Sequence, residues 1–420
     1  MRGPNSHLSR PTIEWGTRLA IAMIIAAIAW LAINWTLAQT IASRDPARAH
    51  RIAPGDGRIS ARLAASLIEA DPTKVDRRKV WQLAVQALHQ DATAVLAAAS
   101  LGLLDDNAAR SRRRFEYAQA LSRRNLATQL WGIEDSVRQG DVRGALHHYD
   151  IALRTEPAAA DLLFPILATA TADPAIRSPL VHLLAKRPMW GGNFITHMSA
   201  SGPDPKVTAV LFAELRRAGV TVSDEASARA VDRLLDRNLP AHAWSYYASI
   251  RLGATRTASR DPKFTASLAT PSRFDWSVVE ADGITASIQR GPSGGIFDFS
   301  IATGVGGPLL RQDQLLPPKE YRIEGHSSGF DQSTDGLPYW TLICRDIGRP
   351  EGRELGRVTL PSSAGYFAGR FDVPADCPVQ TLVLMARPVS SATGLSGQID
   401  RVTLMAARMP PHTAMQGRAR

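Results

Sequence analysis

Residues 325–329 read GHSSG, which matches the G-x-S-x-G pattern of a nucleophile elbow. There, a serine on a sharp strand-to-helix turn attacks an ester or amide carbonyl while a histidine takes its proton. The serine would be Ser327. A nucleophile elbow needs a helix after its serine, but the segment FDQSTDGLPYW (330–340) has no helical period. His326 is its neighbour, and neighbours on a strand point to opposite faces. The only later histidine, His412, follows two prolines in a short tail. We therefore interpret GHSSG as a strand end running into a loop.

Other patterns that could carry chemistry are incomplete. The glycine runs GPSGG (291–295) and GVGG (304–307) lack the Gly-Lys-Ser/Thr ending of a phosphate loop, so we interpret them as turns. No H-E-x-x-H occurs, and His147 and His148 point to different faces of a helix. Asp and Glu are frequent, so a pair of carboxylates that acts as in a glycosidase stays an alternative. The sequence predicts no catalytic residue, no cofactor and no metal, and we expect a protein that is not an enzyme.

Aromatic residues with polar neighbours occur in the last third of the chain. Sugar sites place aromatic faces against C–H surfaces, with Asp, Asn or Arg nearby for the hydroxyls. Trp276 and Trp340 lie in expected strands, where they can instead belong to the core. The candidate ligand-binding residues are Tyr339, Trp340, Arg345 and Asp298, and Trp276, Tyr366 and Asp346 are also available.

The chain has two cysteines, Cys344 and Cys377, and both lie in the last 80 residues. Two cysteines this close together favour a disulfide, which implies an oxidising compartment. Two buried free thiols are the alternative.

Positive charge dominates the chain, with a formal net charge of +10 that comes almost entirely from arginine. No zinc-finger spacing, aromatic RNA-binding run or basic zipper accompanies it, so we expect no nucleic-acid partner. One dense cluster stands out, and it is either a solvated helix face or a patch for an acidic partner, an anionic polymer or lipid headgroups. The cluster consists of Arg110, Arg112, Arg113, Arg114, Arg123 and Arg124.

Near the amino terminus, residues 19–38 form an apolar run without a charge. A helix of this length spans the roughly 30 Å of a bilayer's hydrocarbon core, so we predict a transmembrane anchor after a short cytoplasmic segment (1–18). A cleaved signal peptide is the alternative. Arginines flank both ends, so charge does not decide the orientation. The cysteine pair favours a single-pass protein of a bacterial inner membrane, with its bulk in the periplasm.

Helical periodicity dominates residues 58–258, where apolar residues recur at three- and four-residue spacing. Ala87, Ala120 and Ala152 align in three similar stretches at intervals of 33 and 32 residues. This region resembles the tetratricopeptide-repeat superfamily, most clearly over residues 60–160. That resemblance implies stacked helical pairs that hold protein partners, and it implies no chemistry.

After residue 261 short apolar or alternating runs are separated by Gly, Pro, Asp and Ser. Eight or nine such runs predict an antiparallel β-sandwich, a jelly roll, over residues 262–406. Residues 407–420 are expected to be a disordered tail. The fold class is therefore multi-domain α plus β, with a transmembrane helix, a helical repeat domain and a terminal sandwich.

Together these elements resemble bacterial envelope proteins that join tetratricopeptide repeats to a carbohydrate-binding-like or galactose-binding-like sandwich. The likeness is carried by LSRRNLATQLWGIE, GALHHYDIALRT, LLFPIL (162–167), FDW and the C…VP..C pattern near the cysteines. It implies a membrane-anchored periplasmic scaffold, accessory to exopolysaccharide or other surface-polymer production. Its sandwich would contact polysaccharide or protein. An envelope glycan-active hydrolase or lyase, with acidic residues in the sandwich, is the alternative.

Overall fold

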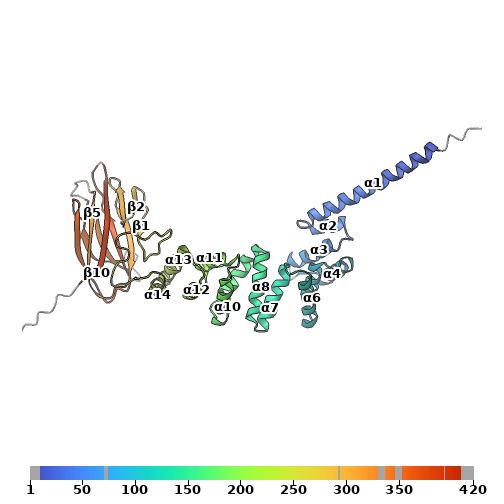
Figure 1. Cartoon of the computed structure of the whole chain (residues 1–420), viewed down its shortest axis with the longest axis horizontal. Helices are drawn as coiled ribbons and strands as arrows, with labels where there is room; N and C mark the ends of the chain where they lie inside the picture. Colours follow the sequence, from blue (N-terminus) through green and yellow to red (C-terminus); the bar gives the residue numbers. More distant parts are fainter. Residues whose placement is uncertain are drawn as a thin grey trace, which may run out of the picture. The chain divides into compact units, whose positions relative to one another are not determined.

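The computed structural model describes residues 10–70, 74–291, 294–329, 336–345, 352–391 and 393–407. The predicted tail after residue 407, and most of the predicted leading segment, lie outside these ranges. The chain is α plus β, with helices followed by two antiparallel sheets. Two compact units are formed, Met1–Leu163 and Phe164–Arg420. Helices from Phe164 onward thus share a unit with the sandwich (Figure 1).

The first helix, α1 (Arg10–Ile41), contains the predicted apolar run. Its segment Trp15–Ile41 is long and apolar enough to cross a membrane, and an 18-residue stretch within it has a mean hydropathy of 2.0. The polar Asn34 donates its amide to the Trp30 carbonyl at 2.8 Å, which satisfies a donor that lipid could not. A signal sequence passes the same test of length and composition, so that alternative stays open.

The rest of the first unit consists of helical hairpins that begin at short polar caps. Asp76, Asn107, Asn125 and Asp141 each accept a backbone N–H in the first turn of the helix that follows. Small buried residues allow the paired helices to approach closely. The helices are α2 (Pro46–Ile52), α3 (Gly57–Ala70), α4 (Arg77–Gln90), α5 (Val95–Leu104), α6 (Ala108–Leu121), α7 (Leu126–Arg138), α8 (Val142–Thr155) and a 3-10 turn, η1 (Pro157–Ala159).

The alanine register predicted for the repeat is wrong at one position. Ala87, Ala118 and Ala152 are the equivalent residues, because each is fully buried and each carbonyl accepts the C-cap N–H of its helix. Ala120 is exposed. The equivalent residues are therefore 31 and 34 apart, since the intervening helix α5 has 10 residues and α7 has 13.

The second unit begins with helices that lead into the sandwich. Arg273 joins the two parts, since it pairs with Asp232 and Asp236 of α13 at 3.7 and 2.8 Å. Trp244 and Tyr247 of α14 also pack against Phe274. These helices are α9 (Ala160–Ala170), α10 (Pro174–Ala185), α11 (Gly191–Ser201), α12 (Pro205–Arg217), α13 (Asp224–Asp236) and α14 (Pro240–Ile250).

Two five-stranded antiparallel sheets form the sandwich, in the orders β2-β3-β10-β5-β8 and β1-β4-β9-β6-β7. Residues alternate along the strands between the outer faces and a shared apolar core. The strands are β1 (Ser277–Val278), β2 (Ile284–Gly291), β3 (Gly294–Ile301), β4 (Gly307–Gln314), β5 (Lys319–Ser328), β6 (Tyr339–Cys344), β7 (Arg353–Thr359), β8 (Gly365–Val373), β9 (Gln380–Ala386) and β10 (Leu395–Ala406).

Candidate functional site

Ser327 lies inside the sandwich and cannot act as a surface nucleophile. It is fully buried on β5, and its Oγ has no hydrogen-bond partner among the described residues. Its neighbour His326 points to the opposite face of the sheet, as strand alternation requires. The GHSSG sequence is therefore the end of a strand, and a proton relay from Ser327 to His326 has no geometry to support it.

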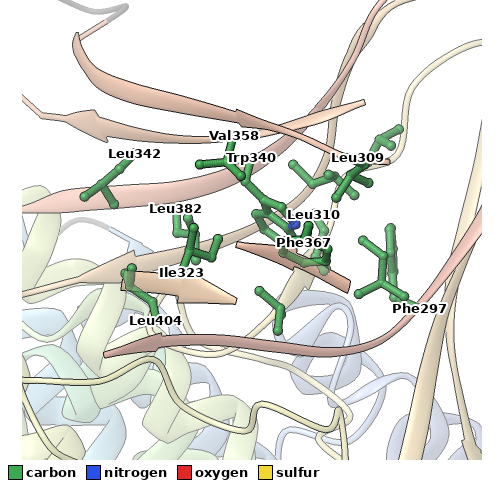
Figure 2. Close-up of a cluster of buried hydrophobic side chains, with 14 of the residues drawn as sticks. Phe297, Leu309, Leu310, Ile323, Trp340, Leu342, Val358, Phe367, Leu382 and Leu404 are labelled. Carbon is green, nitrogen blue, oxygen red and sulfur yellow. The ribbon is translucent and has the colours of Figure 1, made fainter. Parts of the chain in front are cut away.

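Trp340 is a core residue, and its assignment as a ligand-binding residue is corrected. It is 0% exposed, and its indole packs 5.8 Å from that of Trp276, centroid to centroid. Figure 2 shows Trp340 among apolar side chains such as Leu310 and Phe367. Because β6 alternates, an inward Trp340 places Tyr339 on the outer face.

The other three predicted ligand-binding residues are not brought together. Tyr339 lies on the outer face of the β6 sheet, between the guanidinium groups of Arg357 and Arg387, 4.2 and 4.8 Å from its ring centroid. Arg345 follows β6 and pairs with Asp313 at 3.0 Å. Asp298 belongs to β3, in the other sheet. Asp346 lies outside the described residues.

The disulfide between Cys344 and Cys377 is confirmed, with the two Cα atoms 5.7 Å apart. It ties the end of β6 to the segment just before β9 and closes a separation of 33 residues. Both cysteines are buried. The link therefore restrains the sheet that carries Tyr339.

A polar surface with one exposed aromatic ring occupies the outer face of the β5 sheet. Tyr366 on β8 is 82% exposed, and its ring lies 5.0 Å from that of His326 on the paired strand. His326 Nδ1 lies 2.8 Å from Asp400 Oδ2. Nearby on the same face, Gln398 Nε2 donates to Asp298 Oδ2 at 2.7 Å. We call these five residues, Asp298, His326, Tyr366, Gln398 and Asp400, the Tyr366 face.

A β-bulge explains how Asp400 reaches His326. The pairing of β10 with β5 shifts between Ile399 and Arg401, which leaves Asp400 as the extra residue. Both Asp400 and Arg401 are consequently exposed, although strict alternation would have turned one inward. The bulge thus places a carboxylate beside the imidazole.

The sequence reasoning missed most of this face. Tyr366 was an available aromatic, and the alternation in YFAGRF does predict that it points away from the buried Phe367. His326, Gln398 and Asp400 gave no local signal, because their relation depends on strand pairing across 72 to 74 residues. Chemically, the exposed ring can cover an apolar C–H surface while the imidazole, amide and carboxylates bond hydroxyls.

A hollow of about 670 Å³ lies between the end of α14, the linker after it and the sandwich. Its buried polar groups bond to one another. Arg260 donates to Gln314 and to the carbonyls of Phe274 and Asp313, while Asp275 accepts from Tyr247 at 2.7 Å. Burial lowers the pKa of Arg260 to about 10 and raises the pKa of Tyr247. These residues join α14 to the sandwich and are already paired, so we assign them a structural role.

Three arginines of the predicted basic patch are neutralised within the chain. Arg110 and Arg114 pair with Asp105 at 3.1 and 2.7 Å, and Arg112 pairs with Asp135 at 2.8 Å. Arg113, Arg123 and Arg124 are exposed, with no carboxylate paired to them among the residues described. The six arginines therefore do not form one uniform patch.

Comparison with known proteins gives likenesses for the sandwich. No family model matches, and no curated protein matches. A family 4 carbohydrate-binding module has a TM-score of 0.26 and 14% identity, covering 36% of this chain and 99% of that one. The C-terminal family 22 module of Clostridium thermocellum xylanase 10B has a TM-score of 0.26 and 12% identity, covering 37% of this chain and 97% of that one.

Two longer proteins are similar over a small part of their length. The chain covers 20% of a bacteriophage CBA120 tailspike protein, with 10% identity and a TM-score of 0.25 over 32% of this chain. It covers 26% of a two-module piece of the Clostridium thermocellum xylanase, with 10% identity and a TM-score of 0.24 over 32% of this chain. At these values the likeness concerns the sandwich fold, and the ligand must be argued from this chain's own residues.

Proposed function

We propose that this chain is a non-enzymatic, membrane-anchored scaffold of the cell envelope whose sandwich contacts a glycan through the Tyr366 face. The observation that carries this proposal is the 82% exposure of Tyr366 beside the His326–Asp400 pair. Covering an exposed aromatic ring removes apolar surface from water and favours binding, and polar groups at its edge suit a hydroxylated partner. A glycan meets both requirements.

The wider role follows from the other elements. The apolar α1 supports anchoring in an inner membrane, and the buried disulfide supports a periplasmic location. The helical hairpins offer surfaces for protein partners, as in other stacked repeats. We assign the chain to exopolysaccharide or other surface-polymer production as an accessory protein. A non-catalytic role is supported by the engagement of both carboxylates of the face, Asp298 with Gln398 and Asp400 with His326.

The test is calorimetric binding of the full-length chain, in non-ionic detergent micelles, to surface polysaccharide isolated from the source cell. Covering roughly 100 Å² of the Tyr366 ring contributes about 2.5 kcal/mol at about 25 cal/mol per Å². Tyr366→Ala should therefore weaken binding between roughly ten- and a hundredfold. Tyr339→Ala is the matched control, because it removes the same side chain from the opposite sheet, and it should leave the affinity unchanged.

Each alternative gives a different result. Loss of binding in Tyr339→Ala alone would move the glycan site to the β6 sheet. Binding unaffected by either variant, or no binding at all, would make the sandwich a protein contact. Shortening of the polysaccharide during incubation, abolished by Asp400→Asn, would establish the glycan-active enzyme instead.

A further inference from the structure

Arg123 and Arg124 are adjacent, and both are exposed. Arg110, Arg112 and Arg114 pair with buried or half-buried aspartates, whereas the loop that carries Arg123 and Arg124 has no carboxylate paired to either guanidinium in the described part of the chain. Exposed like charges side by side are unfavourable unless an anion relieves them. This pair is therefore the place to look for a bound anion.

The two arginines border a hollow of about 530 Å³. One face of α8 forms the opposite wall, because His147, Ile151 and Arg154 follow the spacing of four and three residues that aligns side chains on a helix. Ile151 is buried and supplies the apolar lining, while three of the other five lining residues are arginines. The lining residues are Arg123, Arg124, His147, Ile151, Arg154 and Thr155, which we call the Arg123 hollow.

One of the arginines that line the hollow has a carboxylate partner. Asp150 lies 3.5 Å from Arg154, one turn away on the same helix. Three arginines thus line the hollow, and no carboxylate is among the residues that line it. The first turn of α7 adds to the positive potential, because its N-terminal end follows directly after Arg124 and Asn125.

The loop that presents the arginines is held in place by hydrogen bonds of its backbone. Gln129 of α7 is 0% exposed and donates to the Arg123 carbonyl at 2.8 Å, while its Oε1 lies 2.8 Å from His148 Nδ1 of α8. The Arg124 N–H donates to Ser122 Oγ at 3.2 Å. The backbone is fixed before any ligand arrives, so less ordering entropy opposes binding.

We propose that the Arg123 hollow binds the carboxylate groups of an anionic polysaccharide. Planar guanidinium groups hold carboxylates through paired, charge-assisted hydrogen bonds. The hollow has one apolar lining residue, Ile151, so it lacks the apolar pockets by which peptide side chains are usually anchored. The choice of a polysaccharide rests on the proposed function. The site itself is separate in sequence from the Tyr366 face and can be tested separately.

The experiment measures binding of an oligogalacturonate to the full-length chain in non-ionic detergent micelles, at low and high salt. Arg123→Gln with Arg124→Gln should weaken binding by at least about tenfold at low salt, and added salt should weaken wild-type binding in the same direction. The matched control is Arg110→Gln with Arg112→Gln, which removes the same charge from paired arginines and should change the affinity less than about threefold. The first double variant alters exposed side chains, and the control leaves Asp105 paired with Arg114 and Asp135 paired with Arg138. Folding should therefore be preserved in both, as circular dichroism will verify.

Equal losses in the two double variants would overturn the proposal, because they would show a general charge effect. A polyglutamate peptide that binds the hollow more tightly than the oligogalacturonate would also overturn it, in favour of an acidic protein partner. Tyr366→Ala separates the two proposals. If only the arginine double variant weakens oligogalacturonate binding, the proposal for the Arg123 hollow is supported and the one for the Tyr366 face is not. If Tyr366→Ala weakens oligogalacturonate binding and the arginine double variant does not, the proposal for the Arg123 hollow is refuted. The proposed function of the Tyr366 face then stands.

Discussion

Replacing Arg260 by methionine should loosen the attachment of α14 to the sandwich. The guanidinium donates to Phe274 O at 2.7 Å, to Gln314 Oε1 at 2.9 Å and to Asp313 O, all in a buried site. Methionine fills a similar volume but has no donor. Three buried acceptors without donors cost about 1 kcal/mol each. The lost contact with the rings of Trp244, Tyr247 and Phe274 adds about 1 kcal/mol.

The expected total is about 4 kcal/mol, or roughly a thousandfold in the local opening equilibrium. Hydrogen-exchange mass spectrometry of the full-length chain in detergent measures this equilibrium directly, through the amides of residues 257–276. At pH 7 the guanidinium remains charged, because burial lowers its pKa only to about 10. Arg370→Met is the control, since its pair with Glu320 is exposed and should contribute less than about 1 kcal/mol.

A change of less than about tenfold in exchange at these amides would refute the reasoning. It would mean that the cost of burying the Arg260 charge cancels the hydrogen bonds that it makes. An equal effect in Arg370→Met would instead indicate a general loss of charge balance. Either result would show that Arg260 is not one of the residues that hold α14 against the sandwich.

Four further results are expected. Ser327→Ala should leave glycan binding unchanged and raise stability by about 1 kcal/mol, because it removes a buried hydroxyl without a partner; a melting temperature that falls would contradict this. Replacing both cysteines by alanine should lower the free energy of unfolding by about 4 kcal/mol in the chain-entropy model for a separation of 33 residues, with the wild type under reducing conditions as the comparison; no change in urea unfolding would contradict it. Gly132→Ala should cost about 1–3 kcal/mol, because a Cβ would meet the His148 ring at 2.7 Å, whereas Gly192→Ala meets nothing within 4 Å and should be neutral or stabilising. Burial lowers the pKa of His148 below 6.5, so the unfolded chain takes up the proton first and stability of the first unit should fall as pH drops from 6.5; thermal melts of His148→Gln should lack this component, and an identical pH profile would refute it.

Some elements could not be predicted because their pattern is not local. The strands β4 (GPLLRQDQ) and β7 (RELGRVT) are not among the apolar or alternating runs of this region, since each is about half polar and β4 carries a proline. Central pairing with β9 buries Gln312, Asp313 and Gln314, whose hydrogen bonds come from residues about 50 to 70 positions away. The two-residue error in the alanine register has another origin, because the unequal lengths of α5 and α7 decide which helical positions are equivalent.

The sequence by itself determined the features that depend on spacing within one element. An uncharged apolar run makes α1, three- and four-residue spacing makes the hairpins, and alternation makes most of the sandwich. Two cysteines in one domain also suffice to predict their disulfide. Only the tertiary structure decided which polar residues meet on the outer face of the sandwich and which arginines of the basic cluster pair with a carboxylate. Strand pairing and a bulge bring Asp400 to His326 across 74 residues, and Asp135 reaches Arg112 from the next helix, 23 residues away. Such contacts follow from how elements pack, and a pattern of neighbouring residues carries no record of that packing.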